Sequence, residues 1–258
     1  MLESIAFMHR FFVAPEEAKG KVITLSPAEL HHAVTVLRVR EGDRVAILDG
    51  AGHEFLCEAR RAARDELEFA VVQTNSIPPL PCQLTLIQAL TKGKSMDLIV
   101  QKATELGAHR IVPIVSERSI PEPGEEKVAK WVATAIESIK QCGSAWLPKI
   151  DPPRPAMAVL TEPGPWDLRL VASLQPNARH PRERCDEYRR ERGSAPRSVA
   201  VWVGPEGDFT PAEIHAISGS GAWPITLGPL ILRSETAAIY CLSILNYELQ
   251  TAATVGRD

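Results

Sequence analysis

The residues best suited to chemistry lie near the C-terminus, in two stretches that share one pattern. In each, an apolar run of strand type leads into a turn with glycine and proline, and a helix follows; the stretches are VWVGPEGDFT at 201–210 and ITLGPLILRSETAA at 225–238. Because open α/β sheets bind ligands at the carboxyl ends of their strands, the two stretches predict a ligand site at one sheet edge. The alternative is that both are ordinary strand-to-helix loops, which are often short and rich in glycine.

Capping residues mark the helices that follow the two turns. The sequence TPAE at 210–213 is a capping box with proline at the first helical position, which predicts a helix start there. Gly204 and Gly207 come just before it, where a backbone must bend tightly or approach a ligand closely. In the second stretch Ser234 is a suitable N-cap, and Glu235 is a favourable acid for the first turn.

The two stretches together resemble the signature of a known family. GPEGDFT followed by LGPLILRSETAA is similar to the signature of the ribosomal small-subunit methyltransferase E family, within the SPOUT class of knotted RNA methyltransferases. Upstream segments extend the resemblance over nearly the whole chain: HRFFV at 9–13, HAVTVLRVR at 32–40, KATELG at 102–107 and SERS at 116–119. The chain departs from the family at two positions, since the family usually has glycine at the position of Asp208 and often a basic residue at that of Leu230.

The resemblance implies a reaction and a set of partners. The family methylates N3 of one uridine in 16S ribosomal RNA with S-adenosylmethionine as the cofactor, a step of rRNA processing in ribosome biogenesis. The expected partners are therefore 16S rRNA or the small ribosomal subunit, and a second copy of the chain in a homodimer. Two alternatives remain open: a SPOUT methyltransferase acting on another RNA or position, and a ribosomal RNA-binding assembly factor without catalysis.

The resemblance also assigns the cofactor to three loops. Backbone amides and carbonyls of such loops hold the adenine and methionine ends, which accounts for the glycines and small residues. The expected cofactor-binding residues are Leu174, Gly204, Pro205, Glu206, Gly207, Leu227, Gly228, Ile231 and Leu232. Because the methyl group of a sulfonium is already activated, the enzyme's task is mainly to align and desolvate the two reactants.

The remaining chemistry concerns the proton on uridine N3, which must leave before or during attack. A nearby cation would stabilise the anion that develops on the base. Arg233 is the candidate for that role or for holding the target phosphate. Glu235 is expected to orient Arg233 or assist the departure of the proton, and Thr236 to form a hydrogen bond at the helix start. The alternative is a capped helix with a stabilising acid, and no residue is identified as the general base.

Composition narrows the class of protein. The chain has 258 residues, 45% of them hydrophobic, which suits one large or two modest domains. Its five cysteines are widely spaced without a CxxC pair, which argues against a structural zinc site and a secreted disulfide framework, so no metal is expected. No apolar run reaches transmembrane length, so a cytoplasmic protein is expected. A net charge of −3 counts against indiscriminate nucleic-acid binding and favours a shaped target.

Residues 1–73 are predicted to form a mainly β domain. Strands are expected at 44–50, 54–59 and 67–72, and a helix is expected after the capping box SPAE at 26–29. Short strands with one helix indicate a small barrel, and the resemblance identifies it as a PUA-like RNA-binding domain. The residues expected to bind RNA are His9, Arg10, Arg38, Arg40 and Arg44. The alternative for the arginines is a solvated surface shared with the neighbouring acids.

A proline-rich linker is predicted at 74–81, followed by an α/β domain at 82–258. Strands at 84–89, 110–115, 168–173 and 198–203 alternate with helical patterns, which predicts a mostly parallel sheet. The resemblance adds a SPOUT fold with a trefoil knot. KGKS at 92–95 is not a phosphate loop, because Gln88 stands where that motif needs glycine. Lys92 and Lys94 are nevertheless expected to contact RNA phosphate.

Three further segments carry structural expectations. The Pro-rich stretch 151–166 is expected to be irregular, and the polar stretch 176–198 to be a surface helix or a mobile loop. The last helix, at about 235–251, is apolar on nearly every side. Such a helix must be buried on more than one side, either at the centre of the domain or in a subunit interface.

Overall fold

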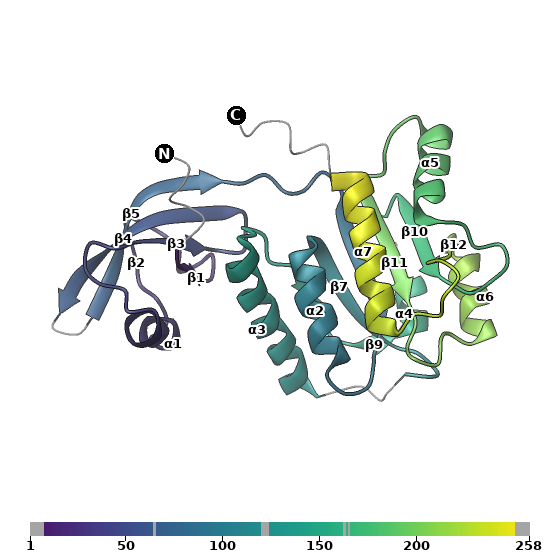
Figure 1. The fold of residues 1–258 in the computed structure, drawn as a ribbon, viewed down its shortest axis with the longest axis horizontal. Coiled ribbons are helices and arrows are strands. Elements are labelled where there is room, and N and C mark those ends of the chain that lie inside the picture. The colour runs from purple at the N-terminus through teal and green to yellow at the C-terminus, as the bar shows by residue number, and fades with distance from the viewer. Residues whose placement is uncertain (1–7, 64–65, 120–123, 162–163, 165, 251–258) are drawn as a thin grey trace. The chain divides into compact units, whose positions relative to one another are not determined.

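The computed structural model describes residues 8–250 apart from 64–65, 120–123, 162–163 and 165. The chain divides into two compact units (Figure 1). The first contains residues 1–79 together with 136–147, and the second contains 80–135 together with 148–258. The long helix α3 (Glu125–Cys142) supplies residues to both units. No helix of the described residues is long and apolar enough to cross a membrane.

The first unit is built on a five-stranded sheet in the order β1-β3-β4-β5-β2. β1 runs parallel to β3, and the other pairs are antiparallel. The strands are β1 (Arg10–Phe12), β2 (Val22–Ile23), β3 (Arg44–Leu48), β4 (His53–Ala63) and β5 (Glu66–Ser76). The three strands predicted from sequence are confirmed as β3, β4 and β5. Alternate residues such as Val45 and Ile47 join Phe11 and Phe69 in one buried core.

The predicted helix of this unit begins at its capping residue but takes an unusual form. The Ser26 hydroxyl accepts the backbone N–H of Glu29, which starts α1 (Pro27–His31). The chain then widens into the π-helix η1 (His32–Val36). The Glu29 carboxylate does not close the capping box: it pairs with Lys140 at 2.7 Å instead. This part of the box prediction is wrong, because a cation from α3 competes for the carboxylate.

The second unit is a parallel α/β sheet, as the alternation of strands and helices predicts. Its sheet has the order β12-β10-β11-β6-β7-β8, and β9 pairs with β7 off this path. Every strand pair of this sheet within the described residues is parallel. The strands are β6 (Gln83–Ala89), β7 (Ala108–Val115), β8 (Lys149–Ile150), β9 (Arg154–Pro155), β10 (Leu168–Ala172), β11 (Ser198–Val203) and β12 (Trp223–Ile225).

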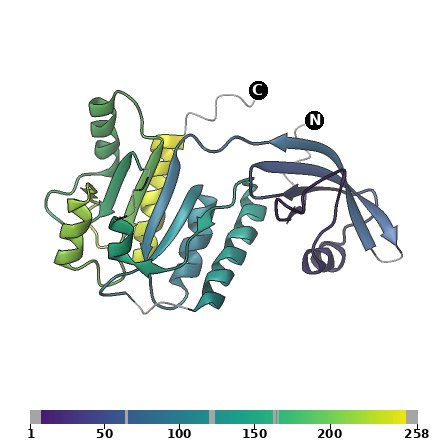
Figure 2. The same ribbon diagram turned by 180° about the vertical axis from the view of Figure 1, so that it is seen from behind.

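Helices cover both faces of this sheet (Figures 1 and 2). α2 (Ser95–Glu105) and α7 (Ser234–Gln250) pack together on one face, where α7 contacts β6 and β11. α4 (Ala156–Leu160) and α6 (Pro211–Gly219) lie on the other face, where they join a core with Ile87 and Trp202. Because both faces are covered, β6 is buried at every position after Gln83.

Three expectations for the second unit need correction or completion. The stretch 151–166 is not wholly irregular, since it contains β9 and α4, and two apolar residues of α4, Ala156 and Val159, are buried in the core. The polar stretch 176–198 contains a surface helix, α5 (Pro181–Arg192), which ends at the left-handed Gly193. β12 ends at Ile225, so the second apolar stretch is mostly a turn and not a strand.

The cysteines of the protein are free thiols, and four of them are buried. Burial raises the pKa of Cys57, Cys82 and Cys241 to about 12, and that of Cys185 to about 11. Thiols with a raised pKa stay protonated and unreactive at neutral pH. Within the described residues, no cluster of His, Cys, Asp and Glu is suited to a metal ion.

Candidate functional site

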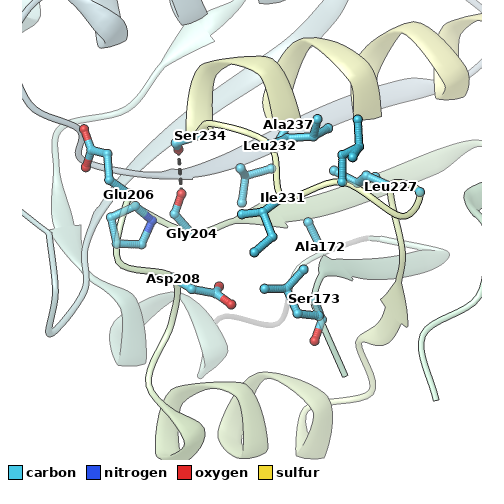
Figure 3. A pocket seen from close by; sticks show the side chains of 15 residues that line it. Ala172, Ser173, Gly204, Glu206, Asp208, Leu227, Ile231, Leu232, Ser234 and Ala237 are labelled. Carbon is cyan, nitrogen blue, oxygen red and sulfur yellow. Dashed lines mark hydrogen bonds between the residues drawn. The ribbon is translucent and has the colours of Figure 1, made fainter. Parts of the chain in front are cut away.

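A pocket lies at the carboxyl ends of β10, β11 and β12, where three turns meet (Figure 3). The turns follow Ala172, Val203 and Ile225, which are the last residues of their strands. The enclosed part of the pocket has a volume of about 100 Å³, and the pocket opens to solvent. It is lined by Ala172, Ser173, Leu174, Val203, Gly204, Pro205, Glu206, Asp208, Leu227, Gly228, Leu230, Ile231, Leu232, Ser234 and Ala237.

The pocket contains most of the residues that the sequence assigned to a cofactor. Leu174, Gly204, Pro205, Glu206, Leu227, Gly228, Ile231 and Leu232 all line it. Gly207 does not: its carbonyl oxygen instead accepts a hydrogen bond of 2.8 Å from the Arg118 guanidinium. The position of a turn after each of three neighbouring parallel strands explains why residues far apart in sequence meet here.

A buried chain of hydrogen bonds holds the β11 turn against the start of α7. The Ser234 hydroxyl donates to the Gly204 carbonyl at 2.6 Å and accepts from Gln88 Nε2 at 2.9 Å. Gln88 is 0% exposed and Ser234 is 5% exposed, so neither side chain has water as an alternative hydrogen-bond partner. The prediction of Ser234 as an N-cap is wrong, because it already belongs to α7 and its hydroxyl points to Gly204.

Two more tethers connect the β11 turn to the loops that follow β6 and β7. The Glu206 carboxylate accepts the backbone N–H of Lys92 at 2.9 Å, and Arg118 holds Gly207 as described. The side chains of Lys92 and Lys94 are exposed on the first of these loops. Sequence reasoning missed Gln88 and Arg118 as site residues, and no local pattern around either of them signals these contacts.

The backbone of the β11 turn requires unusual geometry at two positions. A Cβ on Gly204 would lie 3.0 Å from Asp208 Oδ1 and 3.2 Å from the backbone nitrogen of Phe209, so a side chain would force the turn open. Asp208 has a φ of 57°, in the left-handed region that favours glycine. In the third turn Gly228 has a φ of 105°, which L-residues rarely adopt.

The three candidate catalytic residues lie at the start of α7 but do not line the pocket. Arg233 and Thr236 are exposed, and Glu235 is half-buried. Among the described residues, no hydrogen bond or ion pair joins Arg233 to Glu235, so the structure does not show the predicted orienting contact. Thr236 lines a separate groove along α7 with Tyr240 and Tyr247.

The candidate RNA-binding residues of the first unit occupy different environments. Arg38, Arg40 and Arg44 are exposed, and Arg38 has a left-handed φ of 58°. His9 is also exposed. Arg10 is half-buried in β1, with its guanidinium against Gly143, which follows α3. Arg10 therefore packs against its own unit to an extent that the sequence did not indicate.

Comparisons with known proteins cover almost the whole chain. A family model described as an RNA methyltransferase domain matches residues 78–246, and one described as an RNA methyltransferase PUA domain matches residues 25–72. The ribosomal RNA small subunit methyltransferase E of Synechocystis is 31% identical over 251 residues, which cover 96% of this chain and 80% of that protein. The protein of the same name from Bacillus subtilis is 28% identical, over 94% of this chain and 98% of that protein.

Two solved structures share the fold over similar lengths. A ribosomal RNA small subunit methyltransferase E from Neisseria gonorrhoeae, bound to S-adenosyl methionine, has a TM-score of 0.80 at 26% identity, covering 93% of this chain and 97% of that one. A putative methyltransferase from Legionella pneumophila, in complex with the bound cofactor SAM, has a TM-score of 0.79 at 29% identity and the same coverage. With two family models and relatives matched over nearly its full length, the chain belongs to the ribosomal RNA small subunit methyltransferase E family.

Proposed function

We propose that this protein transfers a methyl group from S-adenosylmethionine to N3 of one uridine in 16S ribosomal RNA. The observation that carries the proposal is the pocket at the ends of β10, β11 and β12, which gathers eight of the nine residues expected to bind the cofactor. Relatives over nearly the full length are named for modification of small-subunit ribosomal RNA, and two similar structures contain S-adenosylmethionine.

The residues of the pocket suit this cofactor. Leu174, Leu230 and Ile231 are 65%, 73% and 83% exposed around its mouth, and exposed apolar side chains gathered in one place favour an apolar ring such as adenine. The turn backbones around Gly204 and Gly228 offer amides and carbonyls for the polar groups of the ligand. The cofactor would supply a methyl group on a positively charged sulfur, ready for direct transfer.

The roles proposed for the start of α7 concern the uridine. Arg233 is exposed and next in sequence to the pocket residue Leu232, so its guanidinium is free to approach a base or phosphate outside the pocket. A positive charge there would stabilise the anion on the base as the N3 proton leaves. Glu235 would assist the departure of that proton, and Thr236 would hydrogen-bond near the helix start. The general base is left unassigned.

The domain organisation proposed for this function follows the sequence. Residues 1–73 would form a PUA-like barrel that binds RNA through His9, Arg10, Arg38, Arg40 and Arg44, residues 74–81 a linker, and residues 82–258 the catalytic domain, with Lys92 and Lys94 on the RNA side. The two matched family models, over residues 25–72 and 78–246, support this division. The structure differs from it in two respects: β5 continues to Ser76, so the linker is shorter than predicted, and the first compact unit also contains residues 136–147. A cytoplasmic location suits an enzyme whose substrate is the ribosomal subunit.

A trefoil knot and a homodimer complete the proposed architecture. β12 is at one edge of the sheet, whereas α7 packs against β6 and β11, so the chain must return from the edge to the middle of the sheet. A groove along α7 is lined by Ile239, Tyr240 and Ile244 and by Tyr247, which is 69% exposed. An exposed apolar groove of this kind supports a subunit interface.

The proposed function can be tested by transfer of tritium from labelled S-adenosylmethionine to small ribosomal subunits from cells that lack this protein. Digestion of the RNA to nucleosides would identify the product. Label in 3-methyluridine is the expected result. Label in another nucleoside would reassign the target, and RNA binding without any label would identify an assembly factor in place of an enzyme.

A further inference from the structure

The charged side chains that line the pocket are all negative. Among its lining residues the ionisable side chains are two carboxylates, Glu206 and Asp208, and the lining contains no lysine, arginine or histidine. Carboxylates in a partly enclosed site attract cations and repel anions, because the surrounding protein screens their field less than water does. The pocket therefore favours a ligand whose enclosed part is positively charged.

The two carboxylates differ in their exposure to solvent and in their hydrogen bonds to the protein. Glu206 is exposed, and its Oε1 accepts the backbone N–H of Lys92, which keeps it at the neighbouring loop. Asp208 is half-buried, and its Oδ1 accepts the backbone N–H of Phe209 at 2.7 Å. Asp208 Oδ2 has no hydrogen bond or ion pair within the described residues. Figure 3 shows this carboxylate pointing into the pocket from the β11 turn.

The backbone of Asp208 carries strain that a different residue would avoid. Its φ of 57° places it in the left-handed region, where glycine is unstrained and where aspartate is tolerated at some cost. Strained backbone conformations cluster at functional sites, where the surrounding structure maintains them. Here the strained residue is also the one that directs a carboxylate into the pocket.

We propose that Asp208 distinguishes the methyl donor from its product by charge, an inference that rests on the proposed function. During transfer the bond between sulfur and the methyl carbon breaks, its electron pair stays on sulfur, a bond forms between that carbon and uridine N3, and the N3 proton leaves to solvent. The sulfonium cation of S-adenosylmethionine thereby becomes the neutral thioether of S-adenosylhomocysteine, while the ammonium and carboxylate of the two molecules are identical.

A carboxylate near the sulfur therefore stabilises the donor more than the product. Asp208 is a specificity-determining residue in this scheme: it raises the affinity for S-adenosylmethionine and gives S-adenosylhomocysteine no matching gain, so the product leaves more readily than the donor. Glu206 contributes less, because its carboxylate is exposed to solvent and bonded to the loop after β6.

Isothermal titration calorimetry with both ligands tests the proposal. Asp208→Asn removes the charge and keeps an oxygen for the N–H of Phe209, and asparagine tolerates the left-handed region. Asp208→Gly removes the charge and the strain together. In both variants the preference for S-adenosylmethionine over S-adenosylhomocysteine, taken as the ratio of the two Kd values, is expected to fall about tenfold, the order of one charge–charge contact. Glu183→Gln, an equal change in charge on the exposed surface of α5, is the matched control and should leave the ratio unchanged.

The outcomes separate this inference from the proposed function. An unchanged ratio in Asp208→Asn, or an equal loss of affinity for both ligands, would overturn the charge role. A normal ratio in Asp208→Gly would overturn it as well, since that variant also lacks the carboxylate. If the wild-type protein binds S-adenosylmethionine and only the ratio test fails, the proposed function stands; if the wild-type protein binds neither ligand, the proposed function itself fails.

Discussion

At the scale of single residues, direct neighbours in the sequence differ in whether their side chains line the pocket. Leu232 and Ser234 line the pocket, while Arg233 between them is exposed outside it. This alternation separates two tasks at the start of α7. We expect the pocket-facing residues to contact a ligand held by the three turns, and Arg233, which is exposed, to meet the RNA.

Replacement of Arg233 by alanine tests this division. Methyl transfer to small ribosomal subunits is expected to fall by about 100-fold or more, as is typical when a group that stabilises developing charge is removed. The Kd for S-adenosylmethionine should change by less than about threefold, because Arg233 does not line the pocket. Single-turnover kinetics and calorimetry give the two values.

A matched variant, Arg197→Ala, removes an exposed arginine that precedes β11 and should retain full transfer. Normal turnover in Arg233→Ala would exclude Arg233 from the mechanism. A large loss of cofactor affinity in that variant would instead place Arg233 among the cofactor contacts.

At the scale of elements, the pocket depends on how the β11 turn is held. The conformation of the turn depends on Gly204, where a Cβ would meet Asp208 and Phe209. Its position depends on hydrogen bonds to three other segments, namely the start of α7 and the loops after β6 and β7. The buried tether through Ser234 connects the end of β6, the β11 turn and the first turn of α7. β6 and β11 are neighbouring strands of the sheet and α7 packs against both of them, so the tether couples the pocket to the core.

Ser234→Ala is expected to loosen the turn. The change leaves the Gly204 carbonyl and one N–H of Gln88 unsatisfied in a buried place, which should lower the free energy of unfolding by about 1–3 kcal/mol. The Kd for S-adenosylmethionine should rise several-fold, since Ser234 and Gly204 both line the pocket. Urea unfolding and calorimetry measure the two effects.

Ser218→Ala on α6 is the control for loss of a hydroxyl, because the Ser218 side chain makes no hydrogen bond within the described part of the chain. Equal stability of Ser234→Ala and wild type would show that the hydrogen-bonded chain contributes nothing to the turn.

At the scale of the whole molecule, the last helix is not fully covered by its own unit. Leu242, Leu245 and Leu249 are buried against the unit, whereas Tyr240 and Tyr247 are 38% and 69% exposed. The prediction that this helix is buried on more than one side is therefore met only in part within one chain. A second copy of the chain is the partner proposed for the remaining face.

Ile244→Glu places a charge in the groove along α7 and should convert a dimer to a monomer, since an unpaired charge buried in an apolar interface is costly. Sedimentation velocity at micromolar concentration reports the change in mass. Met157→Glu, on the exposed surface of α4, is the matched control and should remain dimeric. A wild-type protein that sediments as a monomer would contradict the proposed homodimer.

Local features of the sequence were enough to predict much of the fold. The capping box at Thr210 is confirmed in both directions, with Glu213 N–H bound to the Thr210 hydroxyl and the Glu213 carboxylate bound to Thr210 N–H. The alternation of strands and helices predicted a parallel sheet, and apolar spacing predicted α2 and α7. Such features depend on residues a few positions apart, and backbone hydrogen bonding and periodic burial express them directly.

Residues close together in the sequence therefore predicted the main strands and helices, the turns with glycine and the family of the protein, but not β9, α4 or the π-helix η1. The contacts that hold the site became visible only in the folded chain: Gln88 meets Ser234 across 146 positions, Lys92 meets Glu206 across 114, and Arg118 meets Gly207 across 89. The left-handed backbone of Asp208 and the direction of its carboxylate are likewise visible only in the structure. The physical reason is that a hydrogen bond between distant segments depends on how whole elements pack, and no local spacing encodes that packing.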